Sequence, residues 1–131
     1  MLLMKLKSIE KFAFLELAYH VANIDGEFEQ EEKNVIEEYC AEMGIDNIDY
    51  STDEFDLEET LSKIKTLKSK KIILLELMIL IHSDDKFHRF EHDVIDKIVT
   101  YYNISKKDIE IYSQWGKMAS ALYSQGNILI K

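Results

Sequence analysis

One short acidic pattern occurs twice in this chain, 59 residues apart. An Asp, a Phe three positions later and a Glu four positions after that occur at 25–32 and again at 84–91. Each copy follows an apolar stretch and precedes a Val-Ile pair, at 35–36 and 94–95. A pattern repeated at a fixed offset is typical of a duplicated supersecondary unit. The sequence therefore predicts two helix-loop-helix units in tandem.

The last acidic residue of each copy, Glu32 or Glu91, lies three positions before a valine that helical periodicity places in the core. Residues three apart share a face of a helix, so both carboxylates should turn toward the interior. A buried carboxylate needs hydrogen-bond donors, an opposite charge or a bound cation. The candidate site therefore consists of Asp25, Glu32, Asp84 and Glu91.

Two interpretations of this candidate site remain open. In the first, the carboxylates accept hydrogen bonds from free backbone N–H groups, with Glu32 in the first turn of a helix that begins near Glu29. In the second, all four converge about a pseudo-twofold axis and bind Ca²⁺ or Mg²⁺, because close carboxylates repel unless a hard cation neutralises them. The spacing is not that of an EF-hand loop, since Gly26 stands at the second position and not the sixth.

The fold class expected from the rest of the chain is all-α. The 131 residues include no proline and only four glycines, and Leu, Ile, Glu and Lys are abundant. We expect a single domain over 1–131, a compact bundle of about six helices built from the two repeats. Apolar periodicity and capping residues place the helices at about 6–23, 29–43 (ended by Gly44), 57–67, from a Ser69 cap to 81, 88–102, and from a Ser105 cap through Leu122.

Periodicity also predicts which side chains are buried. In the first helix the expected inward face carries Ile9, Phe12, Ala13, Leu17 and Val21. The apolar tail at 128–130 is expected to pack back on the N-terminal segment, and Tyr112 and Trp115 are expected to fill the core.

Charge distribution limits the classes of partner. Between 25 and 59 the chain has fifteen Asp and Glu against one basic residue, whereas the remainder has ten acidic and fifteen basic residues. Such an acidic side suits a solvated face or a partner protein with a basic surface. We expect no nucleic-acid binding, because phosphate contacts require clustered Lys and Arg and the chain has a single Arg. We expect no membrane span, because the most apolar run, 72–81, has ten residues and contains Glu76. The lone Cys40 and the lack of a secretion signal favour the cytoplasm.

The first acidic motif also carries a family resemblance. An apolar helix ending in Ala22-Asn-Ile-Asp25-Gly26-Glu27-Phe28, followed by Glu32 in an amphipathic helix, resembles the TerB-like family of helical domains. The second copy departs from that pattern, because Asp85 replaces the glycine. The family includes tellurite-resistance proteins and a domain of the membrane-anchored co-chaperone DjlA. The resemblance spans about residues 5–125 and implies an all-helical bundle, a metal or calcium site at the paired acidic motifs, and a role in stress response.

Other candidate chemistry has weaker support. His88-Arg-Phe-Glu91-His92 matches the H-x-x-E-H pattern of some zinc proteases, but such an enzyme needs a further ligand and a substrate cleft in a much larger fold. Zn²⁺ binding by His88 and His92 without catalysis is the milder interpretation. His20 lies four residues after Glu16 and suits a satisfied core histidine. Cys40 suits a packed thiol.

These observations together predict a cytosolic, non-enzymatic interaction or binding module with no certain cofactor. Under the second interpretation of the candidate site, it would bind a divalent cation, Ca²⁺ or Mg²⁺. The alternative is a structural or assembly domain without a ligand. A small metallohydrolase is the remote alternative.

Overall fold

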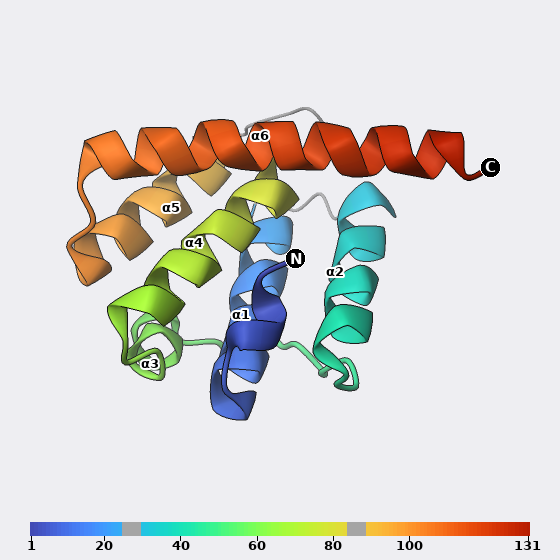
Figure 1. The fold of residues 1–131 in the computed structure, drawn as a ribbon. Coiled ribbons are helices and arrows are strands. Elements are labelled where there is room, and N and C mark those ends of the chain that lie inside the picture. The colour runs from blue at the N-terminus through green and yellow to red at the C-terminus, as the bar shows by residue number, and fades with distance from the viewer. Residues whose placement is uncertain (25–29, 84–88) are drawn as a thin grey trace.

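A computed structural model describes residues 1–24, 30–83 and 89–131, without the side chains of 31 and 89–91. In these residues the chain forms six α-helices, one 3-10 turn and no strand, which confirms the predicted all-α bundle (Figure 1). The elements are the 3-10 turn η1 (Leu3–Lys5) and the helices α1 (Ser8–Asn23), α2 (Gln30–Met43), α3 (Leu57–Ser62), α4 (Leu67–Ile81), α5 (Arg89–Tyr102) and α6 (Lys106–Leu129). Among the described helices, none combines the length and the apolar character that crossing a bilayer requires.

The helix bounds repeat at the offset of the acidic pattern. Adding 59 to the bounds of α1, 8–23, gives 67–82, and α4 covers 67–81. Adding 59 to the bounds of α2, 30–43, gives 89–102, which are the bounds of α5. The two predicted helix-loop-helix units are therefore present as matching pairs of helices, α1 with α2 and α4 with α5.

The second helix of each unit ends in the same way. Gly44 follows α2 with φ +67°, and Asn103 follows α5 with φ +57°. In both places the next residue donates its N–H to a carbonyl five residues earlier, at 3.2 Å after α2 and 3.0 Å after α5. Only glycine and asparagine enter this left-handed conformation readily, so the sequence itself sets these two helix ends.

The first helices of the two units pack against each other at the centre of the bundle. Glu10 of α1 and Ser69 of α4 are 59 positions apart, and the Ser69 hydroxyl donates to the Glu10 carboxylate at 3.2 Å. Contact between equivalent positions is what a pseudo-twofold arrangement produces. Ten residues of α4 are buried, Ser69, Ile72, Ile73, Leu74, Glu76, Leu77, Met78, Ile79, Leu80 and Ile81, so α4 has the central place that its apolar sequence predicts.

The boundary between α3 and α4 differs from the prediction. The helix expected over 57–67 ends at Ser62, and α4 begins at Leu67 with Thr66 as its cap, whose hydroxyl accepts the N–H of Ser69 at 3.1 Å. Ser69 is therefore a buried first-turn residue and not a cap.

The inward face of α1 was predicted correctly in part. Ala13, Leu17 and Val21 are buried, but Ile9 and Phe12 are exposed, and the charged Glu10 lies inside. Apolar residues occur on almost every side of α1, so periodicity alone does not identify the face that packs. Glu10 is buried because it accepts two hydrogen bonds, from the Ser69 hydroxyl and from the N–H of Lys7.

The last helix, α6, extends further than predicted. It crosses one end of the other helices, and its C-terminal half continues past α4 toward α2 (Figure 1). A Cβ at Gly116 would lie 2.4 Å from the Cβ of Met78, so the backbones of α6 and α4 are in close contact there. The 128–130 tail does not fold back as predicted: it completes α6, and its three side chains are exposed.

Candidate functional site

The structure describes only part of the predicted carboxylate site. Glu32 is the third residue of α2, and its side chain is 3% exposed. Glu91 is the third residue of α5, but its side chain lies outside the described residues, as do Asp25 and Asp84. The inward direction of Glu32 is therefore confirmed, whereas the convergence of the four carboxylates stays a prediction.

A second acidic group lies on the surface of α5. One ligand atom from each of His92, Asp93 and Asp96 falls within 4.8 Å of the others, and the Nδ1 atom of His92 lies 3.2 Å from a carboxylate oxygen of Asp96. All three side chains are exposed. His88, the other histidine of the predicted pair, lies outside the described residues. Exposed acidic groups of this kind are common without a metal, so the H-x-x-E-H pattern gains no support from them.

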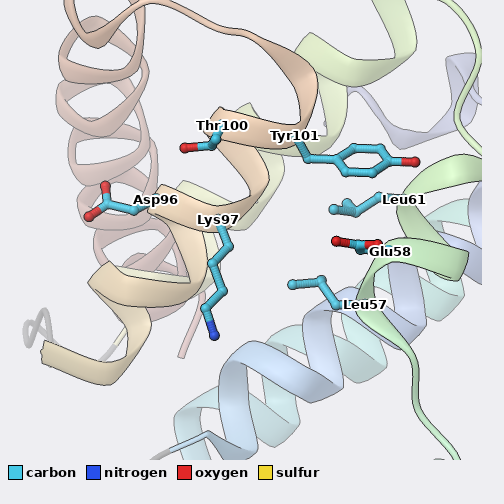
Figure 2. Close-up of a pocket in the computed structure, with 7 residues that line it drawn as sticks. All are labelled: Leu57, Glu58, Leu61, Asp96, Lys97, Thr100 and Tyr101. Carbon is cyan, nitrogen blue, oxygen red and sulfur yellow. The ribbon is translucent and has the colours of Figure 1, made fainter.

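A groove of about 400 Å³ separates α3 from α5. Leu57 and Leu61 of α3 line one side of it with Glu58 between them, the Tyr101 ring of α5 lies beside Leu61, and Lys97 reaches along the α5 side (Figure 2). Asp96 and Thr100 point away from the two leucines (Figure 2). The groove thus presents a small apolar floor with few polar groups aimed into it, which is a weak basis for specific recognition.

A buried carboxylate within the most apolar run of the chain holds the N-terminal segment. Glu76 is fully buried in α4, and its Oε1 accepts the N–H of Leu2 at 2.7 Å. The amino group of Met1 lies 3.4 Å from the same oxygen and also contacts Glu42. Burial raises the pKa of Glu76, and the bond from Leu2 opposes that shift. A carboxylate in the middle of an apolar run was the available signal for this tether.

Cys40 is a buried packing residue, as predicted, whereas His20 is half-buried and lies at the edge of the core. The His20 ring stacks on Phe55 with 4.4 Å between centroids, and burial lowers the pKa of His20. Glu16 binds elsewhere, since it accepts the Thr60 hydroxyl at 2.7 Å. Cys40 is buried, and its burial raises the thiol pKa, which disfavours the reactive thiolate.

Exposed apolar side chains gather on α6 and just beyond its end. Solvent reaches between 41% and 82% of the surface of each member of this set, Ile111, Met118, Leu122, Tyr123, Ile128, Leu129 and Ile130. A hollow of about 420 Å³ lies beside them, and its lining includes Leu122, Tyr123, Gly126 and Ile130 together with Met1. Four of them, Ile111, Met118, Leu122 and Leu129, share one side of the helix, and large apolar side chains grouped on one surface mark an interaction site more often than scattered ones do.

Several of these side chains form a single line along α6. Ile111, Trp115, Met118, Leu122, Gln125 and Leu129 are separated in turn by four, three, four, three and four residues. This alternation keeps them on one side of the helix, and Gln125 is the only polar member. We call these six residues the α6 stripe. Leu122, at the centre of the stripe, is 67% exposed.

Comparison of the chain with family models, with curated proteins and with solved structures finds no match. The TerB-like resemblance therefore depends on the motif residues alone.

Proposed function

We propose that this protein is a non-enzymatic, cytoplasmic interaction module, and that its α6 stripe docks an apolar helix of a partner protein. The observation that supports this proposal most strongly is the line of exposed apolar residues on α6. An apolar line repeating every three and four residues is the pattern with which one helix packs against another.

The surroundings of the stripe favour a partner with basic residues. A smaller cavity adjoins the hollow beside α6, with Met1 and Tyr123 in both linings, and Glu38 and Glu42 line the smaller cavity. Basic side chains beside the docked helix would meet these carboxylates. This arrangement agrees with the basic partner surface expected from the acidic composition of α2.

Peptide selection tests the proposal. A library of helical peptides is selected on the wild-type protein, and the selected peptides are then measured on Leu122→Glu and Ser124→Glu. Both positions are exposed neighbours on α6, but only Leu122 belongs to the stripe. We expect amphipathic peptides that lose affinity for Leu122→Glu by about 100-fold and keep it for Ser124→Glu. Failure to select any peptide that distinguishes the two variants would refute the proposal.

A second candidate function is divalent-cation binding at Asp25, Glu32, Asp84 and Glu91. It is favoured by one observation: Glu32 and Glu91 hold the same third position of matching helices, α2 and α5, and the Glu32 carboxylate is buried. The TerB-like resemblance extends this candidate to a role in stress response.

Calorimetric titration of metal-stripped protein with Ca²⁺ and with Mg²⁺ tests this candidate. The matched variants are Asp25→Asn/Glu32→Gln and Asp84→Asn/Glu91→Gln. We expect the first pair to reduce binding more, because additional acidic residues surround it in the sequence. Absence of binding heat at millimolar cation would leave the carboxylates with the capping role alone.

A further inference from the structure

We propose that the helix docked by the α6 stripe is the α6 of a second copy of this chain, and that the two helices pair in antiparallel orientation. This inference rests on the proposed function, since it names the occupant of the same surface.

The stripe has the form of a coiled-coil seam. Its alternating spacing of three and four residues gives an average period of about 3.5, the period at which two helices keep one side in mutual contact. Ile111, Met118 and Gln125 hold one of the two seam positions of the heptad, and Trp115, Leu122 and Leu129 hold the other. The seam therefore covers nearly the whole of α6.

An antiparallel pair brings the two kinds of seam position into register along the whole helix. Each layer of the seam then contains one residue from each of the two seam positions of the heptad, one contributed by each copy. The sequence numbers of the two residues have the same sum in every layer. The layers, each written as a residue of one copy with its counterpart in the second copy, are Ile111 with Leu129, Trp115 with Gln125, and Met118 with Leu122, each occurring twice.

The Trp115–Gln125 layer provides polar and steric complementarity. Trp115 has an indole N–H that donates, and the side-chain carbonyl of Gln125 accepts. Gly126 stands next to Gln125, and apart from its chain neighbours and the nearby backbone of α6 no atom of the described chain lies within 4 Å of the place where its Cβ would be. The hollow at Gly126 leaves room for the large Trp115 ring of the second copy. In a parallel pair, Trp115 would instead face Trp115, and Gln125 would face Gln125.

Charge also favours self-pairing through α6. From Lys106 to Lys131 the chain carries four Lys against Asp108 and Glu110, whereas the rest of the chain has twelve basic and twenty-three acidic residues. Pairing through α6 thus joins the two copies through their mildly basic segment. In the antiparallel register Lys131 of one copy lies level with Asp108 and Glu110 of the other.

The exposed apolar area of the stripe contributes to the pairing. Its side chains Ile111, Met118, Leu122 and Leu129 are exposed by 54% to 76%. At roughly 100 Å² each, they offer about 400 Å² of apolar surface per copy, about half of the ~800 Å² per partner that a standard protein interface buries in total. Ala121, which is exposed beside the centre of the seam, is small enough for the two helices to approach closely.

Sedimentation equilibrium over a range of protein concentrations tests the pairing. We expect the wild-type mass to approach twice the 15.4 kDa of one chain. Leu122→Glu and Met118→Glu should each raise the dissociation constant by at least about 100-fold, because each replaces two layers of the seam. Ser124→Glu, which adds the same charge off the stripe, should leave the mass unchanged. Circular dichroism confirms that each variant is folded.

Disulfide trapping tests the orientation. Ile111 and Leu129 are eighteen positions apart, which corresponds to about 27 Å of helix at 1.5 Å per residue. In the antiparallel pair, Ile111→Cys should form a crosslink only when mixed with Leu129→Cys, and neither variant should crosslink alone. Crosslinking of each variant with itself would overturn the antiparallel orientation.

The outcomes separate this inference from the proposed function. A wild-type protein that stays at one chain mass at every concentration, yet binds selected peptides through Leu122, refutes self-pairing and leaves the docking function in place. A wild-type dimer that Leu122→Glu and Ser124→Glu weaken equally also refutes pairing through the stripe. Absence of both self-pairing and peptide binding refutes both.

Discussion

The two glycines inside α6 should respond in opposite directions to the same substitution. A Cβ at Gly116 would lie 2.4 Å from the Cβ of Met78 and 2.7 Å from a backbone carbon of the same residue. Carbon atoms pack at about 3.5–4.0 Å, so α6 must move away from α4 by roughly 1 Å. Met78 cannot relieve the clash by changing rotamer, because a Cβ and a backbone carbon are fixed to the helix.

The expected magnitude follows from two opposing effects. Replacing glycine by alanine inside a helix gains about 1 kcal/mol through conformational entropy. Overpacking of a close helix contact costs about 1–3 kcal/mol, and a clash with backbone falls at the upper end of that range. Gly116→Ala should therefore lower the free energy of unfolding by about 1–2 kcal/mol. The Cβ of Gly126→Ala meets no described atom within 4 Å beyond its chain neighbours and the nearby backbone of α6, so this substitution should raise the free energy of unfolding by up to about 1 kcal/mol.

Urea unfolding followed by circular dichroism measures both changes. The comparison is made in the Leu122→Glu background, so that pairing of two copies does not contribute to stability. The difference between the two variants should be about 2–3 kcal/mol. A shift of the same sign and size at both positions would refute the close approach of α4 and α6 at Gly116.

Two further predictions concern buried ionisable groups. Glu76→Ala should lower the free energy of unfolding, measured by urea unfolding, by about 2–3 kcal/mol, because it leaves the N–H of Leu2 without its acceptor. Glu76→Gln should lower it less, because the amide oxygen of Gln still accepts that hydrogen bond. Equal losses for the two variants would contradict the role of Glu76 in holding the N-terminal segment. Burial lowers the pKa of His20 in the folded state, so the folded protein binds a proton at His20 less tightly than the unfolded chain does. The contribution of His20 to the free energy of unfolding is therefore complete above about pH 6.5 and declines as the pH falls below that value. Thermal melts at pH 7.5 and 5.5 should therefore show a larger loss for the wild type than for His20→Gln, and identical losses would contradict the assignment.

The repeat was predictable because its signals are local. An acidic loop pattern, a Val-Ile pair and a residue suited to a left-handed helix end, Gly44 or Asn103, occur at one offset and specify α2 and α5 almost to the residue. Ser105 likewise begins α6 as predicted, with its hydroxyl accepting the N–H of Asp108 at 3.1 Å. Capping and backbone conformation depend on a few neighbouring residues, so the sequence contains the whole signal.

Features set by packing between helices were not predictable in the same way. Periodicity did not identify the buried face of α1, because its apolar residues surround the helix, and Glu10 is buried through its bond from Ser69 of a different helix. An apolar run at 128–130 suggested internal packing, but no described element covers it there. The exposure of the α6 stripe could not be predicted from the sequence for the same reason. An apolar line on a helix does not indicate whether the surface that packs against it belongs to the same chain or to another molecule.

The emission of Trp115 tests the central claim most directly. Trp115 is the only tryptophan of the chain and lies half-buried on the α6 stripe, so its emission reports occupation of that surface and no other. The docking function predicts that Trp115 emission shifts to shorter wavelength when a selected peptide binds. Self-pairing predicts the same shift as protein concentration rises. Neither shift should occur in Leu122→Glu. Emission that stays constant with concentration and with every bound peptide would contradict the claim that α6 is the interaction surface.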